Sequence, residues 1–98
     1  MRRDEAIARL KETEAAIRAL GATSLYLYGS TARDEARPDS DVDVFIEYDT
    51  GKKFSILDLV GVQQELSEQL GAEVDIATRD GLHRRLRKRI EQSAIRIF

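Results

Sequence analysis

Two aspartates on one expected strand, Asp41 and Asp43, are the residues of this sequence best suited to chemistry. They stand two positions apart in DVDVFIEY, so a strand would point both side chains to one face, with Cα atoms about 6.5–7 Å apart. Like charges on one face repel, and a bound divalent cation removes that repulsion. Oxygen donors without His or Cys suit Mg²⁺ or Mn²⁺. Because Mg²⁺ commonly completes its shell with substrate phosphates, the pair predicts a phosphate-bearing substrate.

A glycine–serine pair upstream of these aspartates has the features of a phosphate-binding turn. Gly29 ends the apolar stretch SLYLY, residues 24–28, which we expect to be a strand, and a short helix is expected over 31–36. Glycine lets the backbone approach a phosphate closely, and free N–H groups at a helix start attract the anion. The hydroxyl of Ser30 can donate to a phosphate oxygen. A plain turn with a serine helix cap would use the same two residues.

A third acid, Asp75, lies on the strand expected over 73–77. It alternates with apolar neighbours in EVDIA, as Asp41 and Asp43 alternate with apolar residues in their own strand. If the two strands are neighbours, all three acids converge on one sheet face. Three carboxylates, two metal ions and a nucleotide are the components of phosphoryl or nucleotidyl transfer. An isolated surface acid is the ordinary interpretation of Asp75, so the hypothesis depends on this convergence.

Hydrophobic spacing predicts the elements that must position these residues. Their order is α-β-α-β-α-β-α, which indicates an α/β (α+β) fold with a small three-stranded mixed sheet and helices mainly on one face. The acids would then occupy the other face. Helices are expected over 4–20, 31–36, 55–70 and 81–93, strands over 24–28, 41–48 and 73–77, and an extended segment over the alternating tail 95–98.

Three details of this prediction can be checked residue by residue. Ser55 and Asp58 resemble a capping box at the start of the third helix. The last helix carries Leu82, Leu86 and Ile90 at fourfold spacing, which predicts a buried stripe. The buried stripe expected for the third helix consists of Ile56, Leu59, Val60, Leu66 and Leu70.

Length and composition bound the class of protein. With 98 residues, the chain is expected to form one domain, spanning 1–98. No apolar run reaches the roughly 18 residues that a membrane helix needs, and the N-terminus has no apolar signal-peptide stretch, so a cytoplasmic location is expected. The absence of cysteine and the single histidine, His83, exclude a thiolate or His-rich zinc site within one chain.

Charge is distributed unevenly along the chain, whose net charge is −2. Residues 34–49 carry seven acids against one base, and residues 79–89 carry six bases against one acid. The basic run is typical of a solvated helix face, and a docking surface for a partner or for RNA is the functional alternative. The net charge and the lack of aromatic residues in the run weigh against nucleic acid.

These residues together resemble a known family. Gly29-Ser30, ten further residues, Asp41-x-Asp43 and a later Asp75 on a strand form the combination typical of the polymerase-β-type nucleotidyltransferase superfamily. The short chain and its basic ending, GLHRRLRKRIEQSAIRI, resemble the minimal nucleotidyltransferases of that superfamily, the MNT family. The resemblance covers essentially the whole chain, and no metal-binding position departs from the pattern.

The resemblance implies a reaction and a partner. Members of this family are commonly encoded beside a HEPN-domain protein and act as the antitoxin to this RNase toxin. The implied reaction is the transfer of AMP from ATP to a tyrosine hydroxyl of the toxin, with two Mg²⁺ ions, or Mn²⁺, as cofactors. Neither a membrane nor nucleic acid is expected as a partner, and self-association stays open. The alternative hypothesis is an antitoxin or regulatory module that occludes its partner without catalysis.

The resemblance also assigns roles to individual residues. Gly29 and Ser30 would hold the triphosphate of ATP. Asp41 and Asp43 would bind both metal ions and, through them, the nucleotide. Asp75 would bind the catalytic metal ion and help to deprotonate the acceptor hydroxyl.

Two further residues have supporting roles in this scheme. Arg33, one turn into the phosphate-binding helix, would support the phosphates or the loop that follows; an ion pair with Glu35 or Asp39 is the equally weighted alternative. Ser40 would hydrogen-bond within the loop and so orient Asp41. We therefore expect Arg33 in the nucleotide site, with the three aspartates as the catalytic and metal-binding residues.

Overall fold

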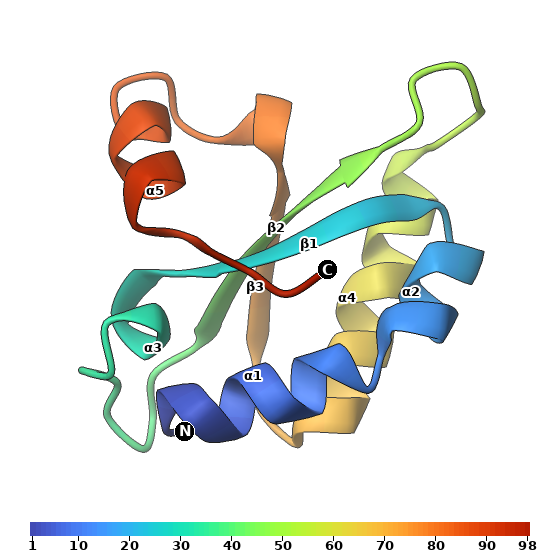
Figure 1. Ribbon diagram of the computed structural model, residues 1–98. Coiled ribbons are helices and arrows are strands. Elements are labelled where there is room, and N and C mark those ends of the chain that lie inside the picture. Colours follow the sequence, from blue (N-terminus) through green and yellow to red (C-terminus); the bar gives the residue numbers. More distant parts are fainter.

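A four-stranded sheet in the order β3-β2-β1-β4 forms the centre of the protein, as the computed structural model of residues 1–98 shows (Figure 1). β1 runs antiparallel to β2 and to β4, whereas β2 and β3 are parallel. The mixed sheet and its helices agree with the expected fold class. The elements are α1 (Arg3–Lys11), α2 (Glu14–Ala19), β1 (Ala22–Tyr28), α3 (Gly29–Ala32), β2 (Val42–Tyr48), α4 (Ile56–Leu70), β3 (Val74–Thr78), the 3₁₀ turn η1 (Arg79–Gly81), α5 (Arg87–Ser93) and β4 (Ile95–Arg96).

The two faces of the sheet differ because side chains alternate along each strand. One face is apolar and packs against α1, α2 and α4, which lie together on that side in Figure 1. The other face carries the acids and is open except where α5 approaches it. The fully buried strand residues of the covered face are Leu25, Leu27, Val44 and Ile46. Helices mainly on one face, with the acids on the other, is the arrangement expected from the sequence.

The C-terminal tail supplies a fourth strand, so the expected count of three strands is wrong. β4 adds to the free edge of β1, where the Ile97 N–H donates to the Leu25 carbonyl at 2.8 Å and the Leu25 N–H donates to the Phe98 carbonyl at 3.0 Å. Ile97 and Phe98 are buried. The alternation of the tail indicated an extended conformation, but its pairing partner lies about seventy positions away in the sequence, where local patterning carries no signal.

The first helix is two helices, not one helix over 4–20. Between α1 and α2, the buried Thr13 donates from its hydroxyl to the Leu10 carbonyl at 2.6 Å, and its N–H donates to the same carbonyl at 3.0 Å. A side-chain hydroxyl that bonds a nearby carbonyl competes with the helical ladder and bends the chain. The break turns Leu20 outward, where it is 38 % exposed.

The last helix is much shorter than the expected span 81–93. Thr78 accepts a hydrogen bond from the Gly81 N–H and caps η1, residues 82–86 are not helical, and α5 begins at Arg87. A continuous helix here would stack basic side chains three and four positions apart, which is unfavourable. Leu82 is buried as expected, but Leu86 is 47 % exposed.

The long helix α4 begins and ends as expected but buries a different stripe. Ser55 and Asp58 form the capping box, and Gly71 ends the helix in the left-handed conformation. Val62, Leu66 and Leu70 face the core, in contrast to the exposed Ile56 and Val60. A stripe through 59, 62, 66 and 70 leaves positions 56 and 60 on the flank of the helix.

The remaining expected elements occur within a few residues of their predicted bounds. The strands expected over 24–28, 41–48 and 73–77 are β1, β2 and β3. The short helix expected over 31–36 begins and ends earlier, as α3. No helix in the structure is both long enough and apolar enough to cross a bilayer.

Candidate active site

Three residues of neighbouring strands form a row across the open face, which we call the acid row: Tyr28, Asp43 and Asp75. Asp43 stands directly opposite Asp75 in the parallel pair β2–β3 and directly opposite Tyr28 in the antiparallel pair β1–β2. Paired residues of adjacent strands, about 4.8 Å apart, point to the same face. The structure therefore brings Asp43 and Asp75 side by side, as their parity predicted.

The three aspartates act on one another electrostatically. The pKa of Asp43 is raised, first by partial burial and then by the negative charges of Asp75 and Asp41. The positive charge of Arg33 opposes this shift. Asp41, which precedes β2, and Asp75 are both exposed. The carboxylates thus repel one another at a face open to solvent, where a cation would be attracted.

Gly29 is fitted against the middle member of the acid row. Its φ is +74°, in the left-handed region that favours glycine. A Cβ atom at this position would overlap the carboxylate of Asp43. Gly29 therefore lets the first turn of α3 lie directly against Asp43, which any side chain would prevent.

Two residues with hydroxyl groups follow Gly29 at the start of α3. Ser30 is half-buried and follows Gly29 directly. Thr31 is 1 % exposed, and its hydroxyl has no hydrogen-bond partner. α3 has only four residues, so its backbone dipole is small, and a phosphate would depend mainly on local N–H and hydroxyl donors.

Arg33 makes the ion pair with Glu35 that was its alternative role, and Ser40 makes the hydrogen bond within the loop that was expected of it. The Nε of Arg33 donates to the Glu35 carboxylate at 3.2 Å, and both side chains are exposed. The positive charge of Arg33 also opposes the rise in the pKa of Asp43, so Arg33 acts on the acid row. The Ser40 hydroxyl accepts from the Arg37 N–H at 3.0 Å and closes the loop that ends at Asp41.

Tyr28 is the member of the acid row to which sequence reasoning gave no firm role. Burial raises the pKa of its phenol, and the nearby charges of Asp43 and Asp75 raise it further. Its ring also lies 5.8 Å from that of Phe45 between centroids. Its strand parity, and its position before Gly29, were the available signals. Tyr28 is therefore the neutral, partly apolar member at the β1 end of the acid row.

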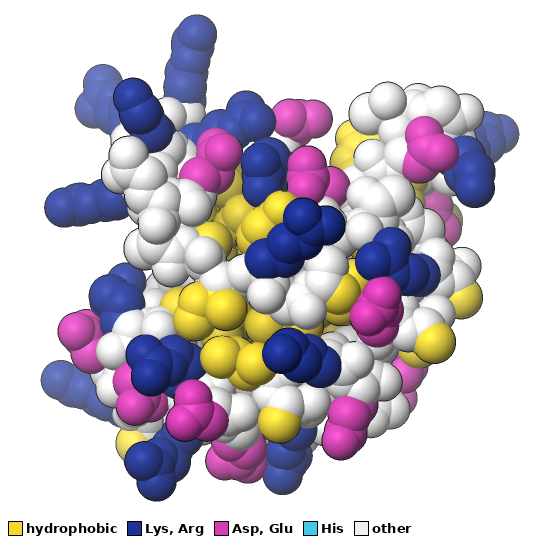
Figure 2. Space-filling view, viewed as in Figure 1, with side chains coloured by type: hydrophobic (Ala, Val, Ile, Leu, Met, Phe, Trp, Pro, Cys, Tyr) yellow, Lys and Arg dark blue, Asp and Glu magenta, His cyan; other side chains and the backbone are white.

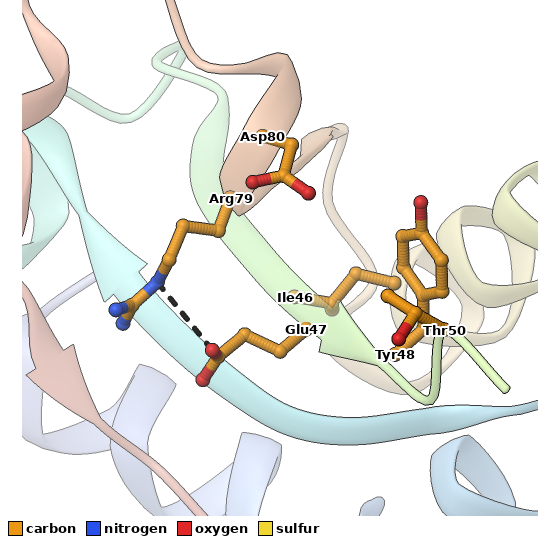
Figure 3. A pocket seen from close by; sticks show the side chains of 6 residues that line it. All are labelled: Ile46, Glu47, Tyr48, Thr50, Arg79 and Asp80. Atoms are coloured by element: carbon orange, nitrogen blue, oxygen red, sulfur yellow. Dashed lines mark ion pairs between the residues drawn. The ribbon is translucent and has the colours of Figure 1, made fainter.

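The far end of the open face is held by Arg79, which the sequence presented only as part of a basic run. Its guanidinium lies 4.9 Å and 5.2 Å from the ring centroids of Tyr26 and Phe45, two rings stacked at 4.6 Å. Arg79 also pairs with Glu47 at 3.8 Å, drawn in Figure 3, and with Glu91 of α5 at 3.5 Å. The alternation of side chains along residues 75, 77 and 79 was the sequence signal that could have placed Arg79 on the same face as Asp75.

A shallow pocket of about 120 Å³ adjoins Arg79, at the end of the face remote from the acid row. Figure 3 shows the side chains that line it: Ile46, Glu47, Tyr48, Thr50, Arg79 and Asp80. No residue of the acid row lines this pocket. The pocket therefore lies away from the acid row, and its lining includes Ile46 of the covered face.

The acid row fits hard divalent cations by the chemistry of its donors. No three His, Cys, Asp or Glu side chains are gathered in a ready-made metal-binding group. The donors offered by Asp41, Asp43 and Asp75 are all carboxylate oxygens, which suit Mg²⁺ better than softer metals. Gly29 abuts Asp43, so only backbone, and no side chain, lies between the start of α3 and this carboxylate.

Comparison with known proteins gives the class to which this fold and site belong. A sequence model of the nucleotidyltransferase domain matches residues 10–97. The chain belongs to the nucleotidyltransferase domain family, and it is an enzyme of the nucleotidyltransferase type.

Individual relatives narrow this class. A protein of Methanocaldococcus jannaschii named as a candidate protein adenylyltransferase is 42 % identical over 72 residues, which cover 74 % of this chain and 75 % of the relative. A solved structure described as a candidate minimal nucleotidyltransferase superposes with a TM-score of 0.82 at 34 % identity and covers 97 % of this chain and 95 % of its own.

A more distant structure shares the fold alone. It is the complex of a tri-AMPylated Shewanella oneidensis HEPN toxin with its MNT antitoxin, with a TM-score of 0.63 at 14 % identity, covering 90 % of this chain and 68 % of the matched chain.

Proposed function

We propose that this nucleotidyltransferase transfers AMP from ATP to a hydroxyl group, that of a tyrosine, on a partner protein. We further propose that the partner is a HEPN RNase toxin and that the chain acts as its antitoxin. The relative named as a protein adenylyltransferase supports protein as the acceptor. The distant complex of an AMPylated HEPN toxin with an MNT antitoxin supports this choice of partner.

The observation that carries the proposal is the pairing of Asp43 with Asp75 across β2 and β3, beneath Gly29. Two carboxylates face each other without a base between them, and a backbone free of a side chain lies against one of them. A structural role does not explain this arrangement, since like charges placed opposite each other destabilise a sheet. A site for metal ions with a bound triphosphate explains both features.

Each residue of the site has a proposed task. Asp41 and Asp43 would hold two Mg²⁺ or Mn²⁺ ions, and Asp75 would hold one of them. When bound, such ions neutralise charge on the phosphates and on the oxygens that attack and leave. Gly29 and Ser30 would place the triphosphate against the acids.

The transfer itself exchanges one bond to the α-phosphorus for another. The acceptor oxygen would bond to the α-phosphorus of ATP as the bond to pyrophosphate breaks. The proton of the acceptor hydroxyl would move to the Asp75 carboxylate. Arg33, whose charge already acts on Asp43, would support the phosphates.

The open face suggests that the partner completes the site. Asp41 and Asp75 are exposed, so a nucleotide bound here would remain in contact with water. Electrostatic stabilisation of a transition state is stronger where water is excluded. A partner that docks over this face would exclude water and position its tyrosine for in-line attack.

The test is incubation with ATP labelled at the α-phosphate and Mg²⁺, with and without a HEPN protein encoded beside this chain. We expect label on a tyrosine of that protein, and none when EDTA removes the metal. Fast labelling of a free small molecule, with the HEPN protein unmodified, would refute the proposal. Neutralisation of the toxin without labelling would favour the non-catalytic, occluding alternative.

A further inference from the structure

Five consecutive or nearly consecutive residues form an exposed surface at the start of α5, which we call the cationic patch: Arg84, Arg85, Leu86, Lys88 and Arg89. All five side chains are exposed, and Leu86 is 47 % exposed. None of the four cations takes part in an ion pair, whereas the neighbouring Arg87 pairs with Asp80 and Glu91. Four unpaired cations on one exposed segment form a surface of a single charge sign, within which Leu86 is the one apolar side chain.

The cationic patch is held beside the open sheet face by ion pairs. Arg87 contacts Glu91 at 3.0 Å and Asp80 at 3.5 Å, and Arg79 contacts Glu91 at 3.5 Å. Because Arg79 lies on the rings of the open face, these contacts fasten α5 to the side of the sheet that carries the acid row. Figure 1 shows α5 on the side opposite α1 and α4, and Figure 2 shows Lys and Arg side chains projecting there.

We propose that the cationic patch docks an acidic segment, with an apolar side chain at its centre, of the protein that accepts AMP. This inference rests on the proposed function, because it names the chemistry of the partner surface at the same site. Leu86 would be the anchor, since interfaces place an apolar contact at their centre and charges around it. The surrounding cations would steer an acidic segment toward the open face and fix its orientation.

A protein segment fits this surface better than RNA. No aromatic residue lies within the basic run 84–89 on which a base could stack. The cations are also confined to six residues, too short a stretch to follow a nucleic-acid backbone.

The test uses defined probes and no ATP or metal. A fluorescein-labelled peptide of twelve residues, Glu-rich with a central Leu-Tyr, is compared by fluorescence anisotropy with its Lys-for-Glu analogue and with a twelve-nucleotide RNA. Variants are Arg84→Glu with Lys88→Glu, and Leu86→Ala. The matched control is Lys52→Glu with Lys53→Glu, which reverses two exposed cations in the turn before α4.

We expect the acidic peptide to bind the wild-type protein and to bind about tenfold more weakly at 0.3 M than at 0.05 M salt. The patch reversal should weaken binding at least tenfold and confer binding of the Lys analogue, and Leu86→Ala should weaken binding about fivefold. An equal loss in the control, or tighter binding of the RNA than of the peptide, would overturn the proposal. If the protein binds the peptide through the cationic patch but labels no acceptor, the proposed function is refuted and the docking proposal stands.

Discussion

The two ends of the open sheet face carry the same kinds of charged residue but arrange them in opposite ways. At one end, Asp43 and Asp75 face each other, and Arg33, whose charge opposes the rise in the pKa of Asp43, is itself paired with Glu35. At the other end, Arg79 lies between Glu47 and Glu91 and on two aromatic rings. The acids at the Arg79 end are neutralised by ion pairs, whereas Asp43 and Asp75 of the acid row take part in no ion pair.

The difference has an energetic meaning. Opposed like charges cost a sheet roughly 0.2–1 kcal/mol, and a bound cation would recover that cost. The paired end gains stability from cation–π and ion-pair contacts without any ligand. We therefore expect substitutions in the acid row to affect binding and substitutions at the Arg79 end to affect folding.

The largest effect is expected for Asp41→Asn combined with Asp43→Asn. The amides keep the size of the side chains but remove the charges that would hold the metal ions. We expect AMP transfer to fall at least about 10³-fold, equivalent to about 4 kcal/mol of transition-state stabilisation, as measured with labelled ATP. The matched control is Glu68→Gln, an exposed acid of α4 that makes no ion pair, which should transfer at nearly the wild-type rate. Loss of folding by circular dichroism in the double variant would count against this interpretation.

The next largest effect is expected for Gly29→Ala, and Gly71→Ala is its matched control. Both glycines have left-handed backbone, with φ of +74° and +63°. Gly29→Ala adds a methyl group that overlaps Asp43, whereas a methyl at Gly71 meets open space. Both changes should cost about 1–2 kcal/mol of unfolding free energy from backbone strain. Only Gly29→Ala should also abolish metal-dependent ATP binding, measured by calorimetry. Equal ATP binding in the two variants would show that the close approach of Gly29 to Asp43 is irrelevant.

Arg79→Met should affect folding but not the nucleotide. The variant keeps an apolar stem but loses the guanidinium that lies on Tyr26 and Phe45. We expect the unfolding free energy to fall by about 1–2 kcal/mol in urea denaturation. Metal-dependent ATP binding should stay within about twofold of wild type, since Arg79 is remote from the acid row. A selective loss of ATP binding at unchanged stability would instead show that the nucleotide binds at the Arg79 end of the face.

The smallest effect concerns Asp43 in the metal-free protein. Its pKa is raised in the folded state above the ordinary 3.8, so the folded protein holds this proton more tightly than the unfolded chain. Stability therefore falls as the pH rises from about 4 through the raised pKa. Asp43→Asn should remove this loss and raise the Tm at pH 7 by about 2–4 °C, corresponding to about 0.5 kcal/mol. A lower Tm in the variant at pH 7, in the presence of EDTA, would contradict the repulsion.

The acid row was predictable from sequence because strand parity is a local property. Asp43 and Asp75 each alternate with apolar residues, so their face was determined as soon as the two strands were neighbours. The position of Gly29 at the end of a strand was predictable for the same reason. What parity could not give was the register that sets Asp43 directly opposite Asp75 and Tyr28, which depends on pairing between distant segments.

The C-terminal region was less predictable because tertiary contacts override its local pattern. Leu82, Leu86 and Ile90 have helical spacing, but the capped turn at Thr78 and the crowded bases delay the helix until Arg87. Arg79 belongs to a run of bases in the sequence and shows its separate role only when its aromatic neighbours on β1 and β2 are known. The ion pair of Arg79 with Glu91 likewise joins two elements whose proximity no local pattern shows.

The most direct test of the account is the position of a paramagnetic ion on the folded protein. Mn²⁺ is added with a non-hydrolysable ATP analogue to ¹⁵N-labelled protein, and the broadening of backbone amide signals is measured. If the ion binds at the acid row, the amides of Gly29, Ser30, Asp43 and Asp75 will broaden first, and the amide of Glu91 will stay sharp. Broadening centred on Glu91 and the paired end, with the acid row sharp, would contradict binding at the acid row.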